Sequence, residues 1–491
     1  MLIFNASNNP FEKGSEGREM VPRRKVRAWT ILLLILLFLF GSCVRGARAM
    51  TVEEEKKLGK KIILEIEKSV DQVKDLALQA FLDKMGRSLV AQVGPTSFEF
   101  KFYLIKASDP NAFAIPGGYI FVTTGLIVLA ENEQEVAGVL SHEIGHVTSR
   151  HVAQMIERSK RLSIASMAAM IAGILLGGGG QGSQAAAAMA VATAEALALK
   201  YTRENEVEAD HKSLQYMTKA GYDPNGLITF LNKINKVSSA SSPKIPAYLS
   251  THPVTENRIS LLENILQMGP KPVGPFKSTG NFRRIQAKVF VEERDSNVAI
   301  TYFQPLVDAN PQDLDGYYGL GLAYRKMGRL DKSAEVFQKA HALAPNDPDI
   351  LRELGVVCFL SGKLDLAIEN LEAMRSIPRN GTDSNEDLLS LYYLGRGYQE
   401  KGDFTKALPL FLRVQKEMPE FVDVHYHLGS VYGRMGQRGR SHLYFGTYFK
   451  LKGERNNALL HFRKASDLLE KGSPEREEVQ REIKELTPSK P

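Results

Sequence analysis

The spacing of hydrophobic positions changes partway along the first part of the chain. Residues 51–92 carry leucines and isoleucines at the spacing of a helix face. Residues 98–105 alternate apolar and polar positions, and residues 112–123 place a Pro-Gly-Gly turn between two strand-like segments. This pattern predicts helical structure followed by a small β-sheet.

Residues 132–158 are expected to form one uninterrupted helix. Asn132 is suited to cap its start, Glu133 and Glu135 suit its first turn, and no proline interrupts the segment. Further on, residues 163–199 consist of two apolar, small-residue arms around a glycine-rich turn. Each arm is too short to span a bilayer, so a helical hairpin or a lid over the neighbouring cleft is favoured over membrane insertion.

From about residue 280 onward the sequence repeats every 34 residues, in a pattern that resembles tetratricopeptide repeats. The recurring positions are small, aromatic or otherwise apolar, and they are Tyr317, Leu320, Gly321, Tyr324, Ser333, Phe337, Ala340 and Pro345, then Leu351, Leu354, Gly355, Cys358, Ala367, Leu371 and Met374, with further copies around Gly395 and Gly429. Stacked helix pairs of this kind form a concave superhelix that binds proteins. Cys358 is expected to be buried between helices.

The segment His142-Glu-Ile-Gly-His146 is an HExxH motif within the expected helix. Histidines at i and i+4 share one face of a helix, so both imidazoles can reach one metal ion. A catalytic zinc site uses three protein ligands and leaves the fourth position to water. Glu143 is placed to take a proton from that water and to pass it to a leaving amine. The motif therefore predicts a zinc peptidase.

An acidic segment downstream offers the third ligand. Glu206 follows His146 by 60 residues, and Glu206 and Asp210 stand at i and i+4 on a second expected helix. One carboxylate can bind zinc, while the other accepts the remaining N–H of a ligand histidine and fixes its tautomer. Standing alone, the segment would be an acidic, solvated helix start.

A metzincin-type third histidine is not expected. That pattern needs glycine at 149 and histidine at 152, where the chain has Ser149 and Val152. His151 is one residue out of phase and would point elsewhere on an uninterrupted helix. It is therefore expected to be structural, or at most to support a ligand from behind.

The motif, together with Tyr201–Asp210 and Ser250–Arg258, resembles the M48 peptidase family of gluzincin metalloproteases, which includes the prenyl-protein proteases. The resemblance covers roughly residues 50 to 275 and implies one zinc ion per chain. The implied roles are His142, His146 and Glu206 as zinc ligands, Glu143 as general base and Asp210 as the residue that orients a ligand.

Two residues near the end of this region carry a further implication. In bacterial periplasmic members of the family, a histidine at the place of His252 can fill the fourth zinc position and keep the enzyme latent. An arginine at the place of Arg258 aids activity there. A fourth imidazole would displace the nucleophilic water, and an arginine near zinc can stabilise an oxyanion. The alternative is a loop histidine and a surface arginine, and the sequence leaves both open.

The formal net charge of +7 is concentrated near the start of the chain. The first 49 residues carry eight Lys/Arg and three Asp/Glu, so only about +2 remains for the other residues. A basic body that would bind nucleic acid is therefore not expected.

The start of the chain has the features of an export signal. A basic stretch precedes the apolar run Trp29–Phe40, and an A-x-A site ends at Ala49, so residues 1–49 are expected to be a signal peptide, with Met20 as an alternative start. An uncleaved anchor and lipidation of Cys43 are the alternatives. Each of them places the protein outside the cytoplasm, and the periplasm is the expected compartment.

The predicted fold is mainly α: a gluzincin-type peptidase domain, helical with a small β-sheet, followed by an α-solenoid of tetratricopeptide repeats. The expected divisions are a signal peptide at 1–49, the peptidase domain at 50–275, the repeat array at 276–475 and a solvated tail at 476–491.

The family resemblance also implies a function and partners. The expected activity is zinc-dependent endopeptidase cleavage of misfolded or misassembled envelope proteins, with unfolded outer-membrane proteins as substrates. The repeat array would recruit these clients or the machinery that assembles outer-membrane barrels, and peripheral membrane contact is compatible with this. The alternative function is a chaperone or assembly scaffold whose zinc site is closed by His252.

Overall fold

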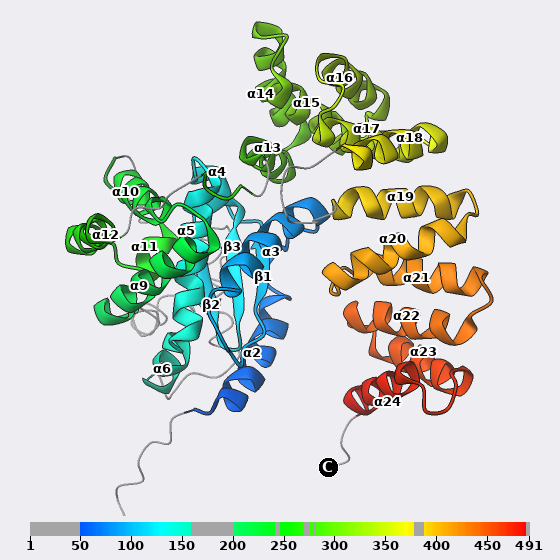
Figure 1. Ribbon diagram of the computed structural model, residues 1–491, viewed down its shortest axis with the longest axis horizontal. Coiled ribbons are helices and arrows are strands. Elements are labelled where there is room, and N and C mark those ends of the chain that lie inside the picture. Colours follow the sequence, from blue (N-terminus) through cyan, green and yellow to red (C-terminus); the bar gives the residue numbers. More distant parts are fainter. Residues whose placement is uncertain are drawn as a thin grey trace, which may run out of the picture. The chain divides into compact units, whose positions relative to one another are not determined.

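The protein, seen here in a computed structural model, consists mostly of helices with one small sheet (Figure 1). The structure describes residues 50–158, 201–240, 246–269, 275–278, 281–377 and 387–487. The predicted signal peptide and the apolar segment 163–199 lie outside these residues. The observed elements confirm the expected fold class, a mainly helical chain with few strands.

Among the described residues, none of the helices combines the length and apolar character required to cross a membrane. The strands are β1 (Lys101–Ile105), β2 (Ala112–Ile115) and β3 (Tyr119–Thr123). The helices up to the end of the predicted peptidase domain are α2 (Val52–Ile66), α3 (Leu76–Val90), α4 (Thr124–Leu129), α5 (Glu133–Thr148), α6 (His151–Arg158), α9 (Arg203–Ala220), α10 (Asn225–Ala240), α11 (Ala247–Thr251) and α12 (Glu256–Met268). The later helices are α13 (Phe282–Glu293), α14 (Ser296–Ala309), α15 (Leu314–Lys326), α16 (Leu330–Leu343), α17 (Pro348–Leu360), α18 (Leu364–Ser376), α19 (Leu388–Glu400), α20 (Phe404–Glu417), α21 (Val422–Arg434), α22 (Arg438–Leu451), α23 (Arg455–Leu468) and α24 (Pro474–Leu486).

The three strands form a mixed sheet in the order β1-β3-β2. β1 runs parallel to β3, whereas β2 runs antiparallel to β3 with Phe113 opposite Phe121. The tight turn between β2 and β3 uses Gly117 and Gly118, whose φ angles of 91° and 96° lie in the region that favours glycine. β2 therefore lies at an edge of the sheet, and it packs against α5.

The helix that carries the HExxH motif is shorter than the sequence suggested. Asn132 caps its start as expected, because its side chain accepts hydrogen bonds from the backbone N–H groups of Gln134 and Glu135. The expectation of one helix to residue 158 is wrong, because α5 ends at Thr148 and α6 begins at His151. Between them Arg150 adopts a left-handed conformation with φ 56°. That conformation costs a non-glycine residue about 1–2 kcal/mol, so surrounding contacts must hold it.

A close approach between α5 and α9 brings the histidines of α5 and the carboxylates of α9 together. A Cβ atom at Gly145 would lie 2.9 Å from the backbone oxygen of Ala209, so a larger residue at 145 would push the helices apart. Both helices are buried along this contact. The glycine of HEIGH therefore sets the distance between the histidines of α5 and the carboxylates of α9.

Successive helices from α14 to α24 pack against one another along the chain, as tetratricopeptide repeats do (Figure 1). The recurring glycines make room for large side chains of the next helix: a Cβ at Gly321 would lie 2.5 Å from the ring of Phe337. Ser333 donates a hydrogen bond of 2.7 Å to the backbone oxygen of Gly321. Cys358 is buried between these helices, and burial raises the pKa of its thiol. Most of the expected tail lies in α24, where Val479 is fully buried.

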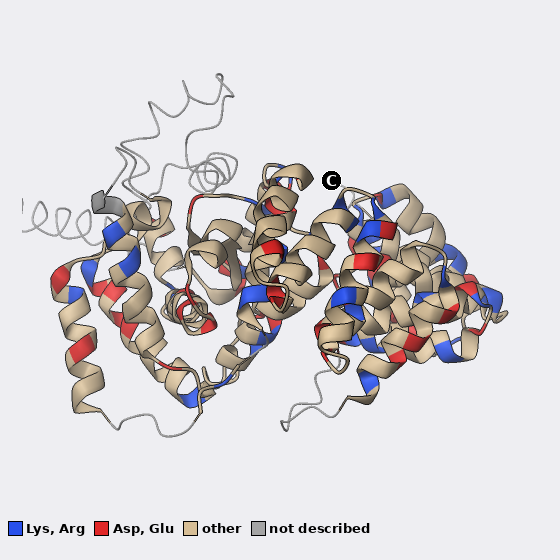
Figure 2. Ribbon diagram, turned by 90° about the horizontal axis from the view of Figure 1, so that it is seen from above, with Lys and Arg blue, Asp and Glu red and all other residues tan. Residues whose placement is uncertain are grey.

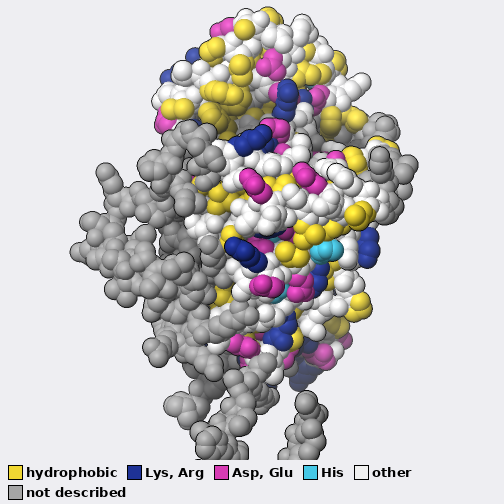
Figure 3. Space-filling view, turned by 90° about the vertical axis from the view of Figure 1, so that its left-hand side faces the viewer, with side chains coloured by type: hydrophobic (Ala, Val, Ile, Leu, Met, Phe, Trp, Pro, Cys, Tyr) yellow, Lys and Arg dark blue, Asp and Glu magenta, His cyan; other side chains and the backbone are white. Residues whose placement is uncertain are grey.

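Basic and acidic residues are interspersed along the described helices (Figure 2). The face in Figure 3 likewise shows hydrophobic, acidic and basic side chains close together. On this face, charges of both signs are thus mixed.

Candidate metal centre

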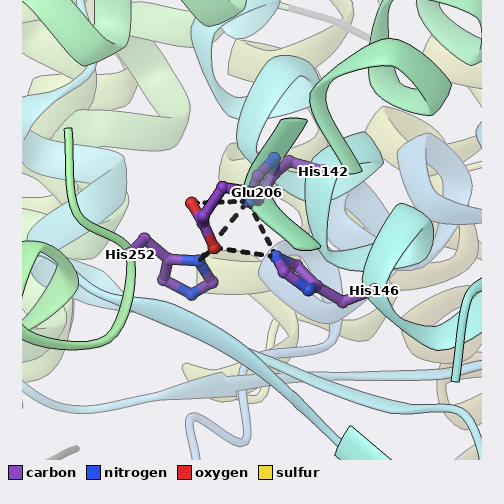
Figure 4. Close-up of side chains that lie close together, drawn as sticks. All are labelled: His142, His146, Glu206 and His252. Atoms are coloured by element: carbon purple, nitrogen blue, oxygen red, sulfur yellow. Dashed lines mark hydrogen bonds and ion pairs between the residues drawn. The ribbon is translucent and has the colours of Figure 1, made fainter. Parts of the chain in front are cut away.

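Four side chains that are far apart in sequence meet in the interior of the peptidase domain (Figure 4). They are His142 and His146 of α5, Glu206 of α9 and His252, which follows α11. One ligand atom from each lies within 4.8 Å of those of the other three, and all four residues are buried. Nε2 of His146 lies 3.0 Å from Nε2 of His142 and 3.3 Å from Oε1 of Glu206.

Local structure explains why these side chains converge. His142 and His146 lie one turn apart on α5, and Glu206 and Asp210 lie one turn apart on α9. Thr202 caps the start of α9 and forms a capping box with Asn205, which fixes where that helix begins. Because Gly145 lets α9 approach α5, the carboxylate pair faces the histidine pair.

Asp210 contacts the first histidine of the motif. Its Oδ1 lies 2.8 Å from Nδ1 of His142, on the side of the ring away from the cluster. This arrangement suits His142 with its proton on Nδ1, which leaves Nε2 free to face the other ligands. The structure thus places Asp210 against the outer nitrogen of His142.

Arg258 is buried and lies against both carboxylates. Its Nη2 donates to Oδ1 of Asp210 at 2.8 Å, its Nη1 contacts Glu206, and its Nη1 also donates to the backbone oxygen of Pro253. Burial alone would raise the pKa of Glu206, but the charges of Arg258 and His252 outweigh it and hold the pKa well below its usual range. For Asp210 too, Arg258 and His142 outweigh burial and lower the pKa. Both carboxylates are therefore held in the charged form.

Glu143 is fully buried beside the cluster. Burial is the largest influence on its carboxyl group and raises the pKa, although His252 and His142 act in the opposite direction. The backbone of Ala114 also acts to lower the pKa of this carboxyl, which places Glu143 near the edge strand β2. A carboxylate with a raised pKa beside the imidazoles of His252 and His142 has the properties of a general base.

His252 lies between Glu143 and Glu206. Its Nε2 is 3.4 Å from Oε1 of Glu143, and its Nδ1 is 3.1 Å from Oε1 of Glu206. Tyr248 stacks on its ring, with centroids 4.6 Å apart and an interplanar angle of 21°. His252 is therefore a buried member of the cluster rather than an exposed loop residue.

Two residues lie behind His146: Tyr201, which was not expected at the site from the sequence, and His151, which was expected at most to support a ligand from behind. The ring of Tyr201 stacks on that of His146 at 3.8 Å, and Nδ1 of His151 lies 3.0 Å from Nδ1 of His146. The expectation that His151 points elsewhere is wrong, because it assumed an uninterrupted helix. The left-handed Arg150 redirects the chain and turns His151 back toward His146.

The residues present fit a metal ion. Two imidazoles and one carboxylate with converging nitrogen and oxygen atoms form the donor set that zinc peptidases use. Burial holds the pKa of His146 well below its ordinary value, so the ring is neutral, which is the form that binds metal.

Comparison with known proteins agrees with this geometry. Residues 76–266 match Peptidase family M48, and residues 286–348 and 325–381 match tetratricopeptide repeats. The "Putative beta-barrel assembly-enhancing protease" of Vibrio cholerae is 27% identical over 86% of this chain and 87% of its own length. The beta-barrel assembly-enhancing protease of Escherichia coli strain K12 is 27% identical over 67% of this chain and 68% of its own. Mitochondrial metalloendopeptidase OMA1 of Schizosaccharomyces pombe is 29% identical over 38% of this chain and 52% of its own.

These similarities confirm the predicted class of enzyme, and the M48 match implies a bound metal. The chain is a zinc metalloendopeptidase with an M48 peptidase domain followed by tetratricopeptide repeats.

Proposed function

We propose that this chain holds one zinc ion through His142, His146 and Glu206 and cleaves peptide bonds of misfolded or misassembled envelope proteins. The observation that carries the proposal is the buried convergence of these three side chains next to Glu143. A zinc ion in this place supplies Lewis acidity to the attacking water and to the scissile carbonyl.

Glu143 acts as the general base in this proposal. Burial raises the pKa of its carboxyl group toward the range in which it can accept a proton from water and later deliver it to the leaving amine. Asp210 fixes the tautomer of His142 through the 2.8 Å contact at Nδ1.

For Arg258, the contacts favour a positioning role over direct stabilisation of an oxyanion. Its Nε, Nη1 and Nη2 atoms are engaged by Asp210, Glu206 and Pro253. A guanidinium held in this way keeps the two carboxylates in the geometry that the histidines need.

The strand β2 offers a place for an extended substrate. It is an edge of the described sheet, and it lies beside α5 and Glu143. A peptide that adds to such an edge is bound through main-chain hydrogen bonds, which tolerate many side-chain sequences. This property suits an enzyme that acts on unfolded proteins.

The proposed clients and compartment rest on the leader-like residues 1–49 and on the names of the relatives. Two of those relatives are described as beta-barrel assembly-enhancing proteases. We propose that the repeat array recruits outer-membrane proteins or the machinery that assembles them, in the periplasm, after removal of residues 1–49. Protein binding is the natural use of stacked tetratricopeptide helices.

A second candidate function is favoured by the position of His252. Its nitrogen atoms lie between the proposed base and a proposed ligand, so it can close the site and leave a chaperone or scaffold whose array carries the function. In the protease function, by contrast, His252 closes the site reversibly and keeps the enzyme latent.

Glu143→Gln separates these functions. The charge of the exposed Glu256 is removed in a control variant, Glu256→Gln. If the protease proposal holds, Glu143→Gln keeps its zinc and loses cleavage of a fluorescent casein probe, while the control cleaves normally. Unchanged cleavage by Glu143→Gln would overturn the assignment of the base. Full rescue of a deletion strain by the inactive variant would favour the scaffold.

A further inference from the structure

We propose that His151 is a positioning residue for the zinc site, acting on His146 through a one-way chain of hydrogen bonds that ends at Glu208. The inference rests on the proposed function, in which His146 is a zinc ligand. The HExxH motif alone gives no indication of this support for His146.

The two rings face each other through like atoms. Nε2 of His146 points into the cluster, 3.0 Å from Nε2 of His142, so its Nδ1 faces the opposite way. There it meets Nδ1 of His151 at 3.0 Å. Two imidazole nitrogens at this distance share one hydrogen atom, so one ring must donate and the other must accept.

The direction of the hydrogen bonds follows from metal binding. Nε2 of His146 can offer a lone pair only if the ring carries its proton on Nδ1, so His146 donates and His151 accepts. The accepting His151 then carries its own proton on Nε2, which lies 3.3 Å from Oε2 of Glu208. The chain therefore runs from the ligand, through His151, to a carboxylate, and each partner fixes the tautomer of the one before it.

Several contacts hold the turn that makes this chain. The left-handed Arg150 places His151 beneath His146, and Nε of Arg150 lies 2.7 Å from the buried carboxylate of Glu55. On the other side, Ser149 donates to Glu208 at 2.6 Å, and Lys212 lies 3.0 Å from the same carboxylate. Backbone strain of the kind seen at Arg150 is common at functional sites.

The two histidine ligands of α5 are thus supported in different ways. His142 meets a carboxylate directly at Asp210, whereas His146 reaches Glu208 only through a second imidazole. Loss of an outer partner of this kind weakens metal binding by about 10- to 100-fold. We expect His151 to contribute to zinc affinity in that range.

The experiment measures zinc affinity by competition with a chromogenic chelator, in the full-length mature chain. His151→Leu removes the acceptor and is expected to weaken zinc binding about 10- to 100-fold. His151→Gln keeps an acceptor and a donor, so we expect it to retain most of the affinity. His211→Leu, an exposed histidine on the neighbouring α9, is the matched control and is expected to bind as the wild type does. Glu208→Ala lies at a half-exposed carboxylate and tests the end of the chain with little risk to folding.

Thermal unfolding of the metal-free proteins separates positioning from a purely structural role. Equal melting temperatures for metal-free His151→Leu and wild type, with weaker zinc binding by the variant, support the proposal. Wild-type zinc affinity in both His151→Leu and Glu208→Ala overturns it, as does equal weakening by His151→Leu and His151→Gln. If the wild type itself fails to bind zinc one to one, the proposed zinc site falls and this inference falls with it.

Discussion

Oδ1 of Asp210 lies 2.8 Å from Nδ1 of His142, and the same Oδ1 accepts a hydrogen bond from Nη2 of Arg258 at 2.8 Å. One carboxylate oxygen thus connects a proposed ligand to a buried guanidinium. The three residues form a unit in which each keeps the next in place, so removal of the carboxylate charge should affect both metal binding and stability.

We predict that Asp210→Asn weakens zinc binding by about 10-fold or more. The variant should also lower the free energy of unfolding by about 1–3 kcal/mol, because Arg258 loses a charged partner while it remains buried. Chelator competition and urea unfolding measure the two effects. Asp331→Asn, an exposed acid in the first turn of α16, is the control. Wild-type zinc affinity in Asp210→Asn would contradict the role of Asp210 in fixing the tautomer.

Replacement of His252 tests whether the site is latent. In His252→Ala the imidazole no longer lies between Glu143 and Glu206, so water and substrate gain access to the base. We expect casein cleavage to rise by about 10-fold, which is the effect of one lost competing interaction of about 1.4 kcal/mol. The exposed His211 provides the control variant His211→Ala. Cleavage no faster than in the wild type would show that His252 does not restrain the enzyme.

Gly145→Ala tests how the distance between α5 and α9 controls the site. The added Cβ would lie 2.9 Å from the backbone oxygen of Ala209, and such overpacking costs about 1–3 kcal/mol. Because the shift moves Glu206 away from the histidines, zinc affinity should fall as well. Gly397→Ala is a matched control, since its Cβ meets only the flexible side chain of Ile368 at 3.1 Å. Equal zinc affinity in the two variants would show that the helix contact is not tight enough to set the ligand geometry.

The parts of the site that repeat at helical spacing could be predicted from sequence. His142 and His146, and likewise Glu206 and Asp210, stand at i and i+4, and helix geometry alone brings each pair to one face. The 34-residue repeat predicted the later helices for the same reason, because small and aromatic positions recur where helices touch.

The parts that depend on tertiary contacts could not be predicted. The left-handed turn at Arg150 is held by Glu55 of α2, and residue type alone gives little indication of it. The direction expected for His151 was wrong because the 3.6-residue period of a helix does not continue across the break at Arg150. The sequence likewise indicated Arg258 as a candidate but not its contacts, because those contacts come from a different helix.

The last prediction concerns the pH dependence of the repeat helices. Nδ1 of His427 lies 2.8 Å from Oε1 of Gln399, and its ring stacks on Phe411 at 5.2 Å. Burial, together with the nearby Arg396, lowers the pKa of His427 from 6.5 to about 4. As the pH falls below 6.5, His427 becomes protonated in the unfolded chain, whereas in the folded chain it stays neutral until about pH 4.

The contribution of His427 to stability is therefore fully present above pH 6.5 and is lost as the pH falls toward 4. Its size is at most about 3 kcal/mol, since each pKa unit corresponds to about 1.4 kcal/mol and the ring is partly exposed. His427→Gln should be less stable than the wild type at pH 7.5 but lose less stability between pH 6.5 and 4, as measured by urea midpoints across that range. His211→Gln, which replaces an exposed histidine, should follow the wild type. Parallel curves for His427→Gln and wild type would show that another group causes the acid sensitivity of these helices.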